Sequence, residues 1–226
     1  MSCRWPVLSL LFLTLCVPAR GEEVGHVASV VKVAPPGELK EAIIAELSDE
    51  AVQIADAQGN VWATFWFRKS LPSDAEAEQV KNGLTYREIA PTTLIGAVQF
   101  AKTWGDFRNQ QISAGVYTLR IAIHPMDGDH QGTAPTNDFC LLVPAAQDEK
   151  PSRMPVGTLH ELSGHASGGT HPAVMLLFPN DQPEDTPKLV SKPGKIIALN
   201  VKRPVAAKGM ATHLGFSFVI IGHAQE

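Results

Sequence analysis

Apolar and polar residues alternate along several stretches of the chain, and a period of two is typical of β-strands. The most regular stretch runs from Val116 to His124. One face of that strand would carry Tyr117, Leu119, Ile121 and Ile123, and the opposite face would carry Thr118, Arg120 and His124. This pattern predicts a strand of an antiparallel sheet with one face in the core and the other in water.

The clearest hairpin joins Ala51–Ala55 to Val61–Arg68. Gly59 and Asn60 lie between the two runs and supply residues that turns favour. Large apolar side chains occupy both faces of the returning strand, so we expect both faces to be covered.

Shorter apolar runs and turn residues extend this pattern over the rest of the chain. Further strands are predicted at Thr92–Phe100, Phe139–Val143, Ala173–Phe178, Ile196–Val201 and Phe216–Ile221. Short helices are predicted at Glu38–Leu47 and Leu159–His165, the second with a capping box formed by Thr158 and Glu161 and with Gly168-Gly169 as its end. Many short strands with one or two short helices predict a mainly β fold, an antiparallel β-sandwich.

Composition is consistent with one folded domain. Of the 226 residues, 44% are hydrophobic and 19% are charged, and the 18 glycines and 17 prolines favour a turn-rich chain. The formal net charge is −4, and it becomes −6 once a leader containing Arg4 and Arg20 is removed. This balance argues against nucleic-acid binding, which needs clustered lysine and arginine. We expect a single β-sandwich domain over residues 22–226.

The first 21 residues have the features of a signal peptide. Arg4 precedes an apolar run from Val7 to Val17, and small residues stand at positions 19 and 21. At about 11 residues the run is too short to span a membrane, so the mature chain is expected to be exported to the periplasm or the medium. Leu15 before Cys16 argues against lipidation. Cleavage would leave Cys140 as the only thiol, so the fold would hold no internal disulfide.

Three histidines suggest a zinc protease motif. His165 and His171 have the spacing of its second half, with Gly168 between them. The first half does not fit, because His160 and His165 are five residues apart and would be rotated by about 140° around a helix instead of sharing one face. Zinc held by His160, His165 and His171, with Glu161 as base, is therefore an alternative hypothesis.

The polar segment 125–138 resembles a calcium-binding loop. Asp127, Asp129 and Gln131 occupy the first, third and fifth positions, Gly132 the sixth and Asp138 the twelfth. Gln131 is a weak ligand, Asp138 is shorter than the usual glutamate, and strands instead of helices flank the loop. The simpler interpretation is that these residues form turns, and calcium remains the second alternative.

Several of these segments also resemble a group of exported bacterial proteins found in planctomycetes and similar bacteria, to which no function is assigned. The similarity spans about residues 46–179 and includes the segments 115–120, 125–130, 138–144 and 166–174. The resemblance implies export and a β-rich fold, and it assigns no catalytic residue.

The leading hypothesis is an exported, non-enzymatic β-sandwich. It would bind a small molecule, a glycan or a protein through the loop 125–138, together with the turn His160–His171, because loops at one end of a sandwich commonly carry recognition. The alternatives are a zinc-dependent hydrolase that uses the histidine cluster, and a structural envelope protein stabilised by calcium.

Overall fold

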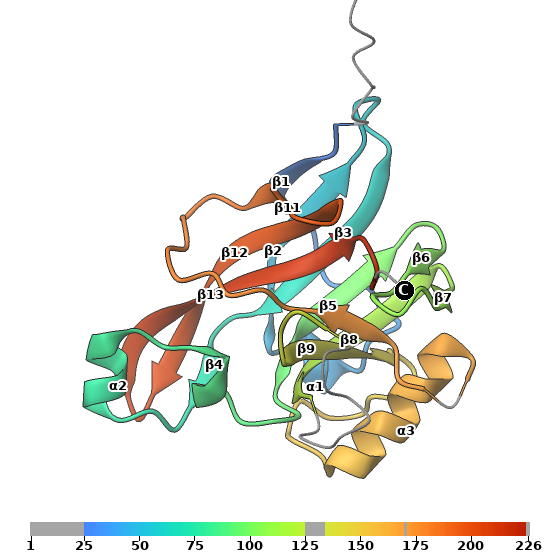
Figure 1. Cartoon of the computed structure of the whole chain (residues 1–226). Helices are drawn as coiled ribbons and strands as arrows, with labels where there is room; N and C mark the ends of the chain where they lie inside the picture. Colours follow the sequence, from blue (N-terminus) through green and yellow to red (C-terminus); the bar gives the residue numbers. More distant parts are fainter. Residues whose placement is uncertain (1–24, 125–133, 170, 225–226) are drawn as a thin grey trace, which may run out of the picture.

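The computed structural model describes residues 25–124, 134–169 and 171–224, and within them the chain is mainly β, as the sequence predicts. A seven-stranded sheet has the order β1-β2-β3-β5-β8-β9-β10, and each neighbouring pair is antiparallel. A four-stranded sheet packs against it (Figure 1). In that sheet β11, β12 and β13 are antiparallel neighbours and β4 pairs with β12 in parallel.

The elements have the following bounds. The large sheet contains β1 (Val27–Lys32), β2 (Leu47–Ala55), β3 (Val61–Arg68), β5 (Leu94–Phe100), β8 (Gly115–Ile123), β9 (Asp138–Pro144) and β10 (Val174–Leu176). The small sheet contains β4 (Leu71–Ser73), β11 (Lys188–Lys192), β12 (Ile196–Ala207) and β13 (Met210–Ile221). A separate two-stranded ribbon is formed by β6 (Trp104–Gly105) and β7 (Gln111–Ile112), and the helices are α1 (Glu41–Ile44), α2 (Ala77–Asn82), the 3₁₀ turn η1 (Tyr86–Glu88) and α3 (Val156–Ser167).

The core between the two sheets is built around stacked phenylalanines. Phe65 and Phe67 from β3 meet Phe216 and Phe218 from β13, and all four are fully buried. The ring centroids of Phe67 and Phe218 lie 5.5 Å apart, and those of Phe216 and Phe218 lie 5.3 Å apart. Burial of these large apolar surfaces is the main force that holds the sheets together.

Two aromatic side chains add hydrogen bonds at the same interface. The Tyr86 hydroxyl donates to the Phe178 carbonyl oxygen at 2.7 Å and accepts from the Ser217 amide at 3.1 Å. The Trp104 indole N–H donates to the Ile220 carbonyl oxygen at 2.8 Å. Both side chains lie in the core, and their polar ends bind backbone of β13 or its surroundings.

The helices differ from the predicted ones in their bounds. The first is a single turn, α1, after which the chain is already extended at Leu47. The second begins earlier than predicted, because the Pro155 carbonyl accepts the Leu159 amide, so the Thr158 cap does not form. The predicted end is confirmed, since Gly168 adopts the left-handed conformation with φ of 68°.

One prediction about the large sheet was wrong. The face of β8 that carries Thr118 and Arg120 was expected to be in water, but both residues are fully buried. Asp148, in the connection between β9 and α3, is fully buried as well. The connection covers this face of β8 because Asp148 pairs with Arg120.

This pairing, which we call the Arg120 clamp, uses all five N–H donors of the guanidinium group. Nε and Nη2 each lie 2.8 Å from an oxygen of Asp148, which also accepts from the Thr118 hydroxyl at 2.5 Å. Nη2 further donates to the Lys150 carbonyl at 2.5 Å, and Nη1 donates to the carbonyl oxygens of Thr92 at 2.8 Å and Ser152 at 3.0 Å. The clamp therefore connects β8 to the segment before β5 and to the connection before α3.

We predict that Asp148→Asn destabilises the protein by about 3–5 kcal/mol, because it leaves the Arg120 charge buried without its partner. The free energy of unfolding in guanidinium chloride measures this. Asp185→Asn is the matched control, since Asp185 forms an exposed ion pair with Lys202 and its loss should change little. The double variant Arg120→Met/Asp148→Leu should be less destabilised than Asp148→Asn. Equal free energies of unfolding for Asp148→Asn and Asp185→Asn would contradict the role of the clamp.

Candidate functional site

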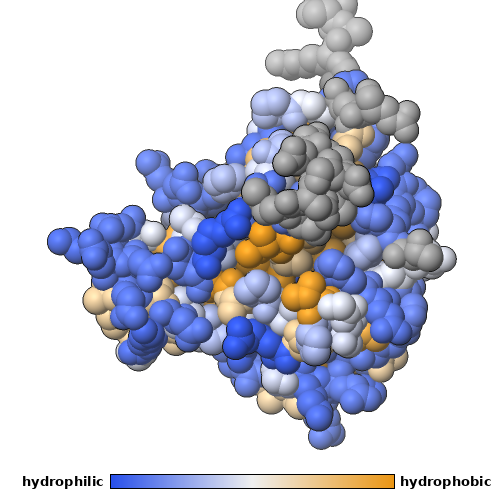
Figure 2. Space-filling view, turned by 60° about the horizontal axis from the view of Figure 1, so that its bottom comes forward, coloured by the Kyte–Doolittle hydropathy of each residue, from blue (hydrophilic) through white to orange (hydrophobic). Residues whose placement is uncertain are grey.

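Apolar surface is exposed in the middle of one face of the molecule and is framed by hydrophilic side chains (Figure 2). A pocket of about 190 Å³ lies among α3, β9, β10 and the turn between β6 and β7. Its walls are mainly apolar, and its polar side chains are basic or imidazole groups. It is lined by Phe107, Arg108, His124, Ala134, Phe139, Leu141, His160, His171, Pro172, Val174 and Leu176. We call it the histidine pocket.

The floor of the histidine pocket comes from two neighbouring strands. Alternation places Phe139 and Leu141 of β9 on the same face, next to Val174 of the antiparallel strand β10. His124 follows β8, and its ring meets Phe139 edge-on, with the ring planes at 86°. The His124 amide also donates to the Asn137 carbonyl at 2.8 Å. The two ends of the segment 124–137 are thereby held together beside the pocket.

A second wall is fixed by a buried aspartate in the turn between β6 and β7. Asp106 is fully buried and accepts four hydrogen bonds: from the amides of Arg108, Gln110 and Val174 and from the Gln110 side chain. The bond to the Val174 amide is 3.0 Å long and connects the turn to β10. The turn thereby holds Phe107 against the strand and places Arg108 at the pocket, where its residue is exposed.

The helix α3 supplies the third wall. Leu159 of α3 packs against Phe139 and Leu141. The buried Ser163 side chain accepts the Ala173 amide at 3.0 Å, which ties the helix to the residues that precede β10. His160 and His171 are both half-buried and line the pocket from this side.

The structure does not bring the three histidines of the zinc hypothesis together. His165 is exposed, and it lines a different pocket, with its Nδ1 atom 2.6 Å from the Gln147 side-chain oxygen. Only His160 and His171 share the histidine pocket. Within the described residues, no three or more His, Cys, Asp or Glu side chains are arranged to hold a metal ion. The arrangement of these residues therefore gives the zinc hypothesis no support.

The calcium hypothesis concerns residues that are mostly outside the described part of the chain. Asp127, Asp129 and Gln131 belong to this undescribed segment, and only Asp138 can be placed. Asp138 begins β9, and its Oδ1 atom lies 3.6 Å from Nε of Arg87. Burial raises the pKa of the Asp138 carboxyl, although the Arg87 charge opposes this rise.

Cys140 is fully buried between the sheets, and burial raises the pKa of its thiol far above the usual value. A thiol of this kind is a poor nucleophile because little of it is ionised.

Sequence reasoning missed Phe107 and Arg108. The available signal was the turn chemistry of Asp106 and Asn109, the second of which has a positive φ of 61°. Those residues indicated a tight turn, but nothing in the local sequence indicated that the turn would dock on β10, more than sixty residues later.

Comparisons with known proteins add no identification: no family model, no curated protein and no solved structure matches the chain. The helices in the described part of the chain all lack the length and apolar character needed to cross a membrane. The class of protein that the structure defines is a mainly β protein with a small, largely apolar pocket.

We predict that the difference in stability between Asp138→Asn and the wild type depends on pH. The variant should gain stability relative to the wild type at neutral pH and lose this advantage in acid. A carboxyl with a raised pKa in the folded state contributes stability at low pH, and this contribution is lost as the pH rises through that pKa. Asparagine removes the cost of the half-buried charge, so the advantage of the variant should disappear when Asp138 of the wild type is protonated. Unfolding curves across the acid range measure the difference.

Asp185→Asn provides a control of opposite sign for this experiment. The hydrogen bond and charge of Lys202 hold the pKa of Asp185 below its usual value, so the stability it contributes is lost as the pH falls. A relative stability of Asp138→Asn that increases toward acid would contradict the assignment.

Proposed function

We propose that this protein is an exported, non-enzymatic β-sandwich that binds a small organic molecule in the histidine pocket. One observation carries the proposal: mainly apolar walls enclose a space that Arg108, His160 and His171 also line, with no carboxylate among the described residues around it. Apolar pockets with a few convergent polar groups are the usual form of small-molecule sites.

The size of the pocket limits the ligand. An apolar cavity of about 150 Å³ in another protein accepts benzene, so the 190 Å³ of the histidine pocket suits one ring with a small substituent. The ring would contact Phe139, Leu141 and Leu176 on the apolar side.

The polar groups limit the ligand further. Arginine is always charged and offers a planar set of donors that matches a carboxylate, and imidazole also donates hydrogen bonds to oxygen acceptors. We therefore propose an aromatic or branched aliphatic carboxylate, with its acid group toward Arg108 and the imidazoles. A cationic ligand would find no counter-charge among these residues.

The position of the histidine pocket supports the hypothesis that the sequence suggested. His124 and Ala134 lie on either side of residues 125–133 and both line the pocket, which His160 and His171 also line. The two segments expected to take part in recognition thus contribute to one site. Export to the periplasm or the medium rests on the leader-like residues 1–21 and is part of the proposal.

We predict that the protein binds 4-fluorobenzoate and that His171→Ala and Arg108→Ala each weaken this binding at least about tenfold, because each removes a donor to a charged acceptor. Line broadening in ¹⁹F NMR spectra during a titration measures the affinity. Neutral fluorobenzene should bind the wild type more weakly than 4-fluorobenzoate does. Its affinity for the two variants should equal its affinity for the wild type.

The matched control is His165→Ala, because His165 belongs to the same helix as His160 but lines another pocket. It should bind 4-fluorobenzoate like the wild type. Equal losses in His165→Ala and His171→Ala would exclude the histidine pocket as the binding site, and absence of saturable binding would refute the proposed ligand class.

A further inference from the structure

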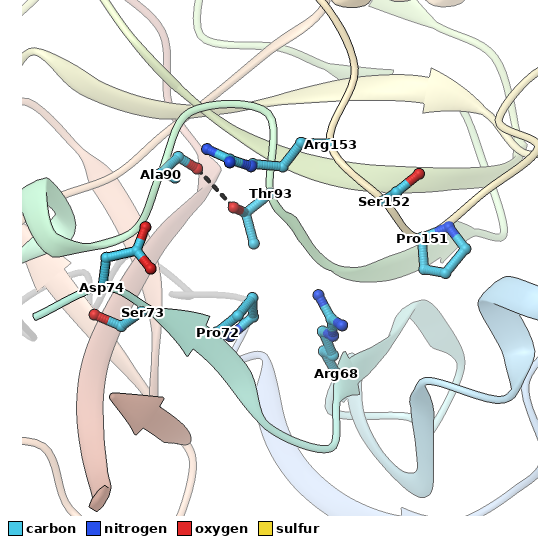
Figure 3. A pocket seen from close by; sticks show the side chains of 9 residues that line it. All are labelled: Arg68, Pro72, Ser73, Asp74, Ala90, Thr93, Pro151, Ser152 and Arg153. Carbon is cyan, nitrogen blue, oxygen red and sulfur yellow. Dashed lines mark hydrogen bonds between the residues drawn. The ribbon is translucent and has the colours of Figure 1, made fainter. Parts of the chain in front are cut away.

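A second cavity, of about 390 Å³, shares no lining residue with the histidine pocket (Figure 3). One wall consists of Arg68 at the end of β3 and Pro72 of β4. The other wall consists of Thr93 and of the residues Pro151–Arg153 before α3. Within the second wall, the Arg120 clamp joins the two segments, because Arg120 donates to the carbonyl oxygens of both Thr92 and Ser152.

Two guanidinium groups reach this cavity from different walls. In Figure 3 Arg68 extends upward into the cavity, and the Arg153 side chain runs along its upper edge, with its guanidinium group beside Ala90 and Thr93. The Arg68 side chain is only 16% exposed, and its Nε and Nη2 atoms both lie within 3.0 Å of one oxygen of Glu46. This ion pair fixes the guanidinium plane and leaves Nη1 for another acceptor. Arg153 is exposed, and the described residues provide it with no hydrogen bond or ion pair.

The walls of the cavity are rigidly held. Nη1 of Arg120 donates to the carbonyl oxygens of both Thr92 and Ser152, and the Met154 amide donates to the Thr92 hydroxyl at 3.1 Å. Thr92 is buried and has a φ of 67°, which is unfavourable for a β-branched residue. Such strain persists only where the surroundings impose it, and it is concentrated at ligand-binding and catalytic sites. It occurs here next to Thr93, which lines the cavity.

The remaining polar groups of the cavity, on Thr93 and Asp74, indicate which other groups the ligand would carry. Thr93 donates its hydroxyl proton to the Ala90 carbonyl at 2.6 Å, so its oxygen can accept a hydrogen bond from a ligand. Asp74 is exposed, and in Figure 3 it lies on the side of the cavity away from Arg68. A carboxylate there accepts hydrogen bonds from hydroxyl groups and repels a second negative charge.

We propose that this cavity binds a sugar acid, a ligand with one carboxylate and several hydroxyl groups. The carboxylate lies between Arg68 and Arg153, and the hydroxyl groups face Thr93 and Asp74. Arginine pairs with carboxylates through parallel hydrogen bonds, which gives both affinity and orientation. Asp74 makes the site selective for a monoanion.

Isothermal titration calorimetry of the purified protein with glucuronate, glucose and inorganic phosphate tests the proposal. We expect saturable binding of glucuronate at millimolar concentration or below, at least about tenfold weaker binding of glucose, and weak binding of phosphate. Arg153→Gln should weaken glucuronate binding at least about tenfold while the protein stays folded, because Arg153 is exposed. Arg68→Lys, which keeps the charge but loses the planar donor set, should cause a smaller loss.

Lys195→Gln is the control for a general loss of positive charge, since Lys195 is exposed in the turn between β11 and β12. It should bind glucuronate like the wild type, and so should His171→Ala, which alters only the histidine pocket. Asp74→Asn should improve the binding of phosphate relative to glucuronate. Equal affinity for glucose and glucuronate, unchanged binding in Arg153→Gln, or no binding of glucuronate would each overturn the proposal.

Discussion

The Arg120 clamp is the constraint on which both candidate sites depend. A charged side chain in the middle of a sheet requires a counter-charge and acceptors for every donor, and these come from Asp148, Thr92, Lys150 and Ser152. If the backbone that supplies these acceptors moved, the Arg120 charge would become exposed or would lose its hydrogen-bond partners. Since this backbone leads directly into α3, the clamp also determines where the helix begins on the sheet, and with it where His160 lies.

The clamp positions segments more than it adds net stability. Removing two charges from water costs several kcal/mol for each, and their attraction in the interior only offsets this cost. A pair of apolar residues could fill the same volume without determining which loop covers the strand. The bidentate contact to Asp148 and the three carbonyl bonds admit only one arrangement of the two segments. This specificity suits a protein in which both cavities combine residues of regular elements with residues of connecting segments.

Most strands of the large sheet were predictable from local alternation or short apolar runs, and the fold class followed from their number and their short spacing. The strands β1, β4, β6, β7 and β11 were not predicted. The burial of Thr118 and Arg120 was not predictable in this way, because alternation separates the two faces of a strand but does not reveal what covers the second face. The partner, Asp148, is 28 positions away and is preceded and followed by residues typical of a solvated loop. For the site, the five-residue spacing of His160 and His165 indicated correctly that they would diverge around a helix. Phe107 and Arg108 reach the same pocket through a long-range hydrogen bond of Asp106 that no local pattern encodes.

The hydrogen bonds of Tyr86 and Trp104 have a consequence for how the protein unfolds. Separating the sheets would expose the phenylalanine stack and also leave the buried phenol and indole without acceptors at Phe178 and Ile220. The packing and the hydrogen bonds are lost together when the two sheets separate. A partly opened state would therefore gain little chain entropy but lose most of the stabilising free energy. The two layers should consequently melt in one cooperative transition, and the small sheet should have no stable existence apart from the large one.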